Sequence, residues 1–230
     1  MSAFSRCAFQ PWRGRMRAAV ILGCCAALAA CAMPKATPYD YTAFKQSRPA
    51  SVVILPPINE TTDIKAGSGV MSSSIAPLAE AGYYVMPASL VEATFRENGL
   101  TVADDVHGVA PARLHAIFGA DAALYMKIKR YGTTYQIIGS ETSVSLEAKM
   151  VDLRSGKLLW EGSASASSAE GRSSNAGGLT GLLVGAVIKQ IVNTATDASY
   201  DYATLANERL LGARQNGSLF GPRSASYQKD

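Results

Sequence analysis

Cysteine is almost absent from this chain of 230 residues, and its few copies are confined to the beginning. They are Cys7, Cys24, Cys25 and Cys31. Beyond Cys31 the chain can form neither a disulfide nor a thiolate metal site, so that part must draw its stability from its core. The crowding of cysteine into the first 31 residues indicates that this segment has a separate purpose.

Acidic residues are also missing from the first 30 positions, where four arginines supply all the charge. An apolar run from Ala18 to Ala30 follows these arginines. The run has 13 residues, whereas a transmembrane helix needs roughly 20. A basic leader, a short apolar run and a small-residue ending are typical of a secretory signal peptide.

The run ends in Leu28-Ala29-Ala30-Cys31, which resembles a bacterial lipoprotein box. The resemblance implies cleavage between Ala30 and Cys31 and a lipid on Cys31; the alternative is an ordinary signal peptide followed by cysteine. Ala32, in place of aspartate, implies sorting to the outer membrane under the rule for such lipoproteins. The segment beginning at Met16 is a complete short signal by itself, so Met16 is a second candidate start.

The net charge changes once the leader is set aside. The whole chain carries 22 basic and 18 acidic residues, a net charge of +4. Four of the basic residues lie in the leader, so the remainder has 18 of each sign and a net charge of zero. A nucleic-acid-binding domain would carry a basic patch, and we therefore expect no nucleic-acid partner.

The composition predicts one folded domain behind a tether. Removal of 30 residues leaves 200, enough for one core. We expect a signal peptide over 1–30, a lipidated tether with three prolines over 31–50, a single α+β domain over 51–212 and a polar, loose tail over 213–230.

Alternation of apolar and polar residues predicts strands. In 123–131 and 142–150 every second residue is apolar, which is typical of a sheet with one buried and one wet face. The turn-forming stretch 152–157 then leads to a returning strand at 158–165, completing an antiparallel three-stranded meander. Shorter strands are expected at 52–55 and 83–87.

Helical signals fill the gaps between these strands. Helices are expected at 69–81, 89–98, 111–118 and 179–211. Pro77 predicts a kink or a late start in the first, and Ser89 with Glu92 predicts a capping box in the second. The order β-α-β-α-α-β-β-β-α indicates an α+β fold: a mixed sheet ending in the meander, helices on one side and a long C-terminal helix.

Four long stretches resemble a family of bacterial lipoproteins of unknown function that includes a neisserial surface antigen. They are 55–100, 119–140, 148–164 and 219–230, and include LPPINETTDIKAGSG, AKMVDLRSGKLLWEGSA and LFGPRSASYQKD. Such proteins are distantly similar to the curli-secretion-channel lipoprotein and to the amino-terminal domain of the Tol-system translocation protein. The resemblance implies one component of an outer-membrane assembly with envelope lipoprotein partners, and it brings no catalytic residues. The small-residue stretch 163–178 departs from the family pattern.

Candidate sites for chemistry are few. His107, in a turn beside Asp104 and Asp105, suits either a weak metal site or a solvated loop. His115 is interpreted as half-buried packing, and the Gly/Ser-rich stretch 66–74 as a flexible loop rather than an anion site. The sequence has no G-x-S-x-G, no G-x-G-x-x-G after a strand and no P-loop, so we predict no enzyme, no cofactor and no metal.

A stripe of small residues is the sharper feature. Gly177, Gly181 and Gly185 recur every four residues, which favours a self-association or partner-docking face; packing on the sheet is the alternative. Seven tyrosines give weak further support for a binding protein: Tyr39, Tyr41, Tyr83, Tyr84, Tyr125, Tyr131 and Tyr135.

The sequence thus favours a non-enzymatic, periplasm-facing outer-membrane lipoprotein. It would bind a curli-channel-like or other envelope protein, or a second copy of itself. A carrier of a lipid or small apolar ligand is the alternative hypothesis, and a hydrolase is a third.

Overall fold

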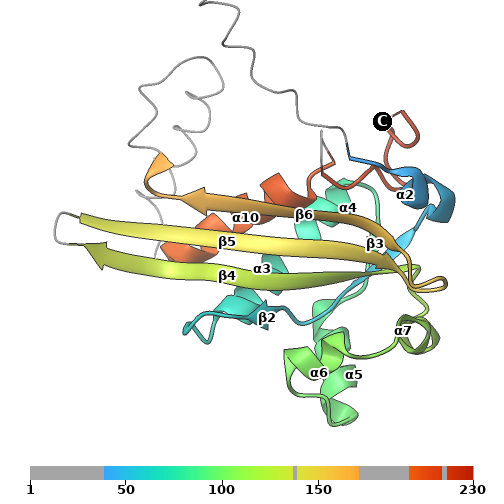
Figure 1. The fold of residues 1–230 in the computed structure, drawn as a ribbon, viewed down its shortest axis with the longest axis horizontal. Coiled ribbons are helices and arrows are strands. Elements are labelled where there is room, and N and C mark those ends of the chain that lie inside the picture. The colour runs from blue at the N-terminus through green and yellow to red at the C-terminus, as the bar shows by residue number, and fades with distance from the viewer. Residues whose placement is uncertain (1–38, 137–138, 171–196, 214–216, 230) are drawn as a thin grey trace, which may run out of the picture. The chain divides into compact units, whose positions relative to one another are not determined.

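The computed structural model describes residues 39–136, 139–170, 197–213 and 217–229. Figure 1 follows the chain from blue to red through these ranges. The elements, in chain order, are α2 (Thr42–Ser47), β1 (Ser51–Ile54), β2 (Ile58–Asn59), α3 (Ala66–Ser73), α4 (Ile75–Glu80), β3 (Tyr84–Val85), α5 (Ala88–Glu97), α6 (Ala103–His107), α7 (Pro111–Phe118), β4 (Ala122–Gln136), β5 (Gly139–Asp152), β6 (Leu158–Ser167) and α10 (Ala198–Leu211).

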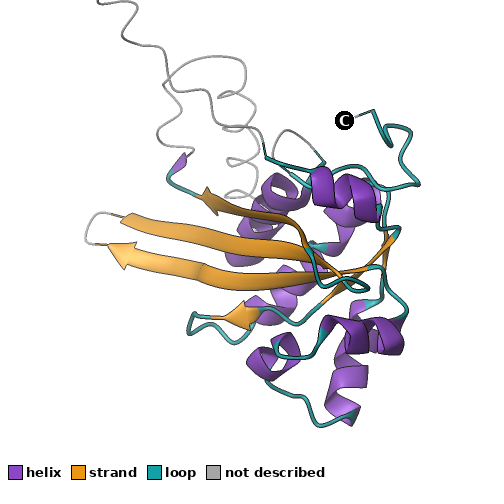
Figure 2. Ribbon diagram, turned by 45° about the vertical axis from the view of Figure 1, so that its right-hand side comes forward, coloured by secondary structure: helices purple, strands orange, loops and turns teal. Residues whose placement is uncertain are grey.

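The described strands form one mixed sheet in the order β3-β1-β4-β5-β6, and the short β2 also pairs with β4. Strand β1 is parallel to both β3 and β4, whereas β4, β5 and β6 run antiparallel. The three antiparallel strands are the long arrows of Figure 2. This topology confirms the predicted α+β class and the three-stranded meander. Strands β4 and β5 reach further than predicted, to Gln136 and from Gly139.

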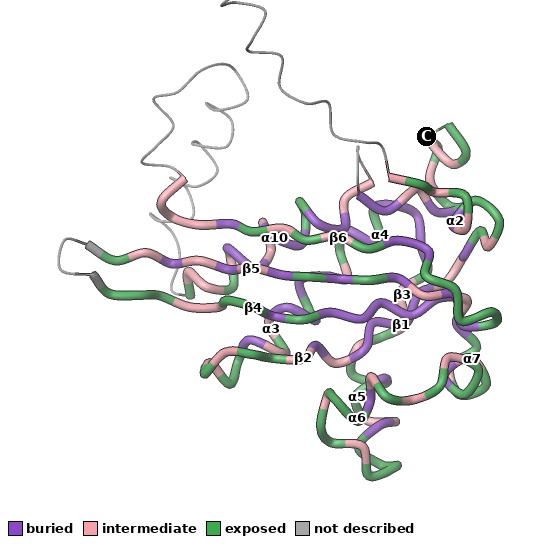
Figure 3. Tube along the Cα trace, in the orientation of Figure 1, coloured by how far each residue is buried: buried purple, intermediate pink, exposed green. Residues whose placement is uncertain are grey.

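One face of the meander forms the core. Its alternate side chains are fully buried, among them Leu124, Met126, Met150 and Trp160. Helices α3 and α10 cover this face, with α4 packed beside them, and Figure 3 shows the buried stretches running along the strands there. Apolar burial of this kind stabilises by about 25 cal/mol per Å². The helices that cover the meander thus lie on this side, whereas α6 packs against Tyr125 on the other.

Two predicted helices form close to their expected limits. Helix α7 begins at Pro111, ends at Phe118 and is followed by Gly119. Helix α5 spans Ala88–Glu97, but its predicted capping box is wrong. Pro87 is the N-cap, and no side chain caps the helix. Ser89 and Glu92 both lie within the helix instead of at its cap. Proline is tolerated at the start of a helix, as Pro111 is in α7, because the amide it lacks would have no helical partner there.

Pro77 divides the helix predicted over 69–81 into α3 and α4, which meet at Ser74. Proline has no N–H to donate to the carbonyl four residues earlier, so a helix cannot continue through it unbroken. The Gly/Ser-rich stretch 66–74, interpreted as a flexible loop, is helical, and that interpretation is wrong. Val70 and Met71 are buried there, and a Cβ on Gly69 would lie 2.8 Å from the Tyr131 hydroxyl.

The C-terminal helix is confirmed from Ala198 onward. The N-cap residue Asp197 has φ −132° and ψ 81°, so a helix running unbroken through this point is wrong. The earlier part of the predicted helix, 179–196, lies outside the described residues. The Asn207 amide, fully buried, donates to the Val70 carbonyl (3.0 Å) and to the Ser73 hydroxyl (2.8 Å). These bonds fasten α10 to α3.

Both ends of the described chain pack against the domain. In the segment predicted as tether, α2 forms and Phe44 is buried. The Tyr41 hydroxyl donates to the Gly217 carbonyl at 2.6 Å. The C-terminal segment 217–229 is not loose: its Gly221 amide donates to the Ala81 carbonyl at 2.8 Å. Gly82 has φ +96°, and a Cβ there would lie 2.5 Å from the Ser224 amide, so only glycine lets the segment approach.

Among the described helices, none combines the length and the apolar character that crossing a membrane requires.

Candidate functional site

Three of the predicted sites lie outside the described residues. They are the cleavage position Ala30–Cys31, the lipidated Cys31, and the small-residue face of Gly177, Gly181 and Gly185. All three therefore stay predictions. Within the described part of the chain, no three His, Cys, Asp or Glu side chains come together so as to hold a metal ion.

His107 is packed rather than solvated. It is the last residue of the short helix α6, and its Nε2 lies 3.0 Å from the Pro56 carbonyl oxygen. Its ring meets the Tyr125 ring edge-on, with centroids 5.2 Å apart. Burial lowers the pKa of His107, outweighing the Pro56 hydrogen bond and the Asp104 carboxylate, which both act to raise it. The neutral imidazole therefore fastens α6 to the strands, and the solvated-loop interpretation is wrong.

His115 behaves as the sequence predicts. It is half-buried, and its Nδ1 lies 2.7 Å from the Ala120 carbonyl oxygen just beyond the end of α7. The contact closes the turn between α7 and β4.

The face of the meander opposite α10 carries a groove with a volume of about 750 Å³. Helix α6 forms one side of it, and residues of β4, β5 and β6 form the floor. The lining includes Ile58, Asp104, His107, Gly108, Tyr125, Lys127, Glu147, Ala148, Lys149, Glu161, Gly162 and Ser163. We call this set the open-face groove.

Opposite charges face each other across the floor of the open-face groove. Lys127 is the direct partner of Glu147 in the β4–β5 register, and Lys149 is the partner of Glu161 in the β5–β6 register. Cross-strand pairs of opposite charge favour the register modestly, by about 0.2–1 kcal/mol each. All four side chains are exposed, so their charged ends remain available to a partner.

A buried aromatic residue, Tyr125, is part of this charged floor. The Lys149 ammonium lies 5.1 Å from the centre of the Tyr125 ring, on which His107 also packs. Burial raises the pKa of Tyr125, so the phenol stays neutral. The groove thus offers exposed charges of both signs beside a buried tyrosine, and such charges suit recognition of a polar surface.

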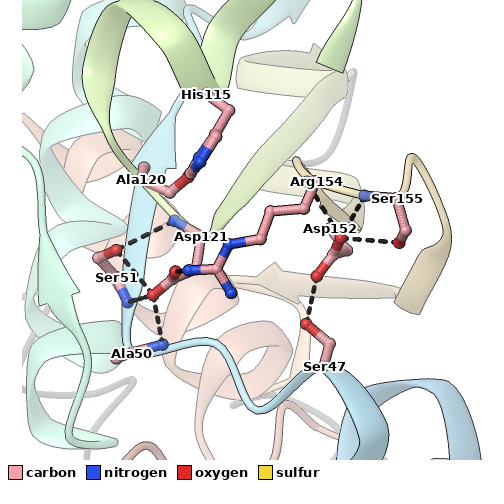
Figure 4. Close-up of polar contacts among 9 residues, drawn as sticks. All are labelled: Ser47, Ala50, Ser51, His115, Ala120, Asp121, Asp152, Arg154 and Ser155. Atoms are coloured by element: carbon pink, nitrogen blue, oxygen red, sulfur yellow. Dashed lines mark hydrogen bonds and ion pairs between the residues drawn. The ribbon is translucent and has the colours of Figure 1, made fainter. Parts of the chain in front are cut away.

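A second polar cluster closes the end of the sheet where the chain enters the domain (Figure 4). The Asp121 carboxylate accepts hydrogen bonds from the Ala50 amide (2.9 Å) and the Ser51 amide (3.1 Å), and it pairs with Arg154. The Asp152 carboxylate accepts from the Ser47 hydroxyl at 2.5 Å and from the turn that follows β5. Figure 4 shows these two carboxylates, one just before β4 and one at the end of β5, tying α2 and β1 in place.

Two opposing effects act on the pKa of Asp152. Burial by itself would raise the pKa of this carboxyl, but hydrogen bonds from Ser47, Ser155 and Arg154 outweigh it, so the pKa is lowered. Sequence reasoning read 152–157 only as a turn and did not find this cluster. The Asp-x-x-Ser spacing typical of an Asx turn was the available signal for the turn half of it.

Three of the seven tyrosines singled out in the sequence make contacts that hold the fold together. Tyr41 and Tyr83 donate to carbonyls of the C-terminal segment, and Tyr131 lies against α3. Tyr125 belongs to the open-face groove, whereas Tyr135, near the far end of β4, is 85% exposed.

Comparison with known proteins assigns the chain to a family. The family described as "Putative lipoprotein GNA1162-like" matches residues 39–223. The chain belongs to this GNA1162-like family. It is 50% identical over 212 residues to the "Putative lipoprotein NMB1124/NMB1162" of Neisseria meningitidis serogroup B, covering 91% of this chain and 98% of that one.

One solved structure agrees with this assignment. The crystal structure of lipoprotein GNA1162 from Neisseria meningitidis shares 50% identity and a TM-score of 0.51, covering 64% of this chain and all of that chain. A PelC dodecamer from Paraburkholderia phytofirmans is 14% identical with a TM-score of 0.38, covering 67% of this chain and 89% of that one, a likeness too remote to bear on function. Membership of the GNA1162-like family confirms the recognised resemblance and places the chain among lipoproteins, which are held at membranes by their lipid.

Proposed function

We propose that this GNA1162-like protein is an outer-membrane-anchored, periplasm-facing lipoprotein that works without catalysis, as a binding component of an envelope or secretion assembly. The observation that carries the proposal is the open-face groove. Helices cover one face of the meander, while the charged groove on the other is open to a partner. Lipidation of Cys31 would hold the domain at the membrane.

The character of the groove supports a protein partner. Small-ligand pockets are mostly apolar with a few polar groups, whereas this floor alternates Lys127, Glu147, Lys149 and Glu161. Exposed charges of both signs suit a complementary polar protein surface, where they set orientation and association rate more than affinity. The family resemblance makes a curli-channel-like lipoprotein the first partner to test, and a second copy of this chain the next.

The alternative, a carrier of a lipid or small apolar ligand, gains no comparable support. The hollow beside Phe44 has a volume of about 200 Å³, and its rim includes Lys45 and Arg48. Pockets that enclose a whole small ligand usually begin at about 300 Å³, so this hollow could not enclose an acyl chain. The larger open-face groove is lined by charges, which an apolar ligand would strip of water at a cost.

The test is site-specific photo-crosslinking in the native envelope. A photoreactive amino acid replaces Lys127 in the groove or, as the matched control, Arg96, an exposed cation on α5. We expect a covalent adduct with another envelope protein, or with a second copy, from position 127 and not from position 96. Mass spectrometry identifies the adduct, and the intact mass of the same sample reports acylation of Cys31.

Two charge variants sharpen the result. Lys127→Glu places two carboxylates opposite each other at the β4–β5 register, whereas Lys127→Glu combined with Glu147→Lys restores a pair of opposite charge. We expect both to fold and both to reduce the adduct formed from a probe at Ser163. Equal adduct yields from the groove and from position 96, or monomer alone from both, would refute the binding role.

A further inference from the structure

A small hollow lies between α2 and the C-terminal segment, at the end of the domain where the chain enters. Figure 1 shows the C-terminus beside α2. The hollow has a volume of about 200 Å³. It is lined by Phe44, Lys45, Arg48, Pro49, Leu219, Phe220, Tyr227 and Gln228. Phe44 and Pro49 are buried, whereas Lys45 and Arg48 are exposed, so the hollow combines an apolar base with a basic rim.

The backbone around this hollow is strained at two places. In the described part of the chain, the non-glycine residues with positive φ are Arg48, at 48°, and Gln228, at 60°. Both line the hollow. Left-handed backbone disfavours side chains other than glycine, and such residues gather at binding sites because the surrounding structure holds them there. A helix C-terminus such as that of α2 would ordinarily favour glycine at position 48.

The strain at Arg48 sets the position of its charge. The Arg48 Nε donates to the Lys45 carbonyl at 3.2 Å, which ties this side chain to the last turn of α2. The carboxylates bonded to neighbouring residues already have partners of their own. Asp152 accepts from Ser47 and Ser155, and Asp121 is paired with Arg154 and bonded to the backbone of β1.

The covalent chain limits where this end of the domain can be. Seven residues separate Cys31 from Tyr39, the first described residue, and Tyr39 is only three residues before α2. A fully extended chain covers at most 3.3–3.6 Å per residue, so Tyr39 lies within about 28 Å of a lipidated Cys31. The hollow therefore lies at the end of the domain from which the tether leaves, within reach of a membrane that holds the anchor.

We propose that this hollow binds the phosphate of an anionic phospholipid headgroup, with Arg48 facing the phosphate and Phe220 and Tyr227 lying at the headgroup level. The inference rests on the proposed lipid anchor, and it adds a second, headgroup-specific contact to it. The volume suits a headgroup rather than an acyl chain, and a guanidinium recognises phosphate oxygens well. Aromatic rings with a polar tip suit the membrane interface.

The test compares the lipidated protein, purified with its anchor from its own envelope, in vesicles of two compositions. One contains phosphatidylcholine alone and the other contains about 30% phosphatidylglycerol, in line with the anionic surfaces that attract basic side chains. Hydrogen exchange is followed for peptides covering 41–49 and 217–229. We expect slower exchange in the phosphatidylglycerol vesicles, by roughly fivefold for each basic side chain engaged, and a smaller difference at high salt.

Three variants separate binding from folding. Arg48→Gly removes the charge and relieves the left-handed strain, so we expect an unchanged or higher unfolding temperature but loss of most of the lipid-dependent protection. Arg48→Lys should keep part of the protection. Arg96→Ala removes an exposed arginine from α5 and should keep all of it.

The outcomes are distinct. Acylated protein that exchanges equally in both vesicles, or Arg48→Gly protein that keeps full protection, overturns the headgroup site and leaves the anchor intact. Protein whose intact mass shows no acyl chains on Cys31 overturns the anchor, and the headgroup site with it. Protection abolished by soluble glycerol phosphate at low concentration would show a phosphate site that does not need a bilayer, which also overturns the proposal.

Discussion

The two faces of the meander are built from the same strands, but one is buried and the other is exposed. On one face Leu124, Met126 and Trp160 are buried beneath α10 and α3. On the other Lys127 and Glu147 remain exposed, facing each other across β4 and β5. Because neighbouring side chains of a strand point to opposite faces, this division follows directly from the alternation in the sequence.

The difference teaches where stability and recognition reside. Burial gives the covered face a stability role, since each large apolar side chain contributes about 1.5–3 kcal/mol. The charged face contributes little to stability, because exposed ion pairs are worth about 0–1 kcal/mol. Residues on a surface that contributes little to folding can serve binding to a partner without a loss of stability. Substitutions on the two faces should therefore have separable consequences.

The largest expected effect separates two adjacent residues of β6. Trp160 is fully buried, and Glu161 is exposed on the opposite face. Trp160→Ala should lower the free energy of unfolding by about 3–5 kcal/mol, whereas Glu161→Ala should change it by less than about 0.5 kcal/mol. Denaturant titration followed by circular dichroism measures both. Similar decreases in the free energy of unfolding for the two variants would show that the charged face also stabilises the fold.

Period-two alternation made the meander predictable, because a half-buried antiparallel strand repeats its contacts every second residue. Helix α7 was equally readable, since proline begins it and glycine follows its last residue. Sequence reasoning failed where long-range backbone contacts decide the structure. The C-terminal segment is polar, yet Gly221 donates to Ala81 and Tyr83 donates to Leu219, and such bonds leave no periodicity.

The candidate site was only partly visible in the sequence. His107 stood out as a possible ligand and Tyr125 as a possible interface residue, but nothing in their spacing indicated that α6 would set one ring on the other. The charges of β4 and β5 were read as a wet face, which is correct. Their gathering into a groove depends on α6, whose five residues are too few to give a helical pattern.

An intermediate effect probes the close contact that the covered face makes with α3. A Cβ added at Gly69 would lie 2.8 Å from the Tyr131 hydroxyl. We expect Gly69→Ala to destabilise the protein by about 1–3 kcal/mol through overpacking. In a Tyr131→Phe background the clash is removed, and the same change should stabilise by up to about 1 kcal/mol, because alanine favours helix more than glycine does.

A double-mutant cycle measures that coupling. Equal effects of Gly69→Ala with and without the Tyr131 hydroxyl would mean that α3 moves freely against β4. The covered face would then be a looser contact than its burial suggests.

The smallest expected effect tests the open face through pH. Burial holds the native pKa of His107 below its unfolded value of about 6.5, against the attraction of Asp104 and together with repulsion from Lys149 and Lys127. Between the native pKa and the unfolded pKa of His107, the unfolded chain therefore binds more protons than the native one. The stability that the neutral ring provides is complete above about pH 6.5 and is lost as the pH falls toward the native pKa.

His107→Gln cannot titrate yet can still donate to the Pro56 carbonyl, and His107→Phe keeps the packing on Tyr125 without either property. We expect the wild type to lose more unfolding free energy than both variants between pH 8 and pH 5.5, in parallel denaturant titrations. A wild type that follows the variants across this range would place His107 in water. The open-face groove would then lack its rigid side, because α6 is held to the strands through this ring.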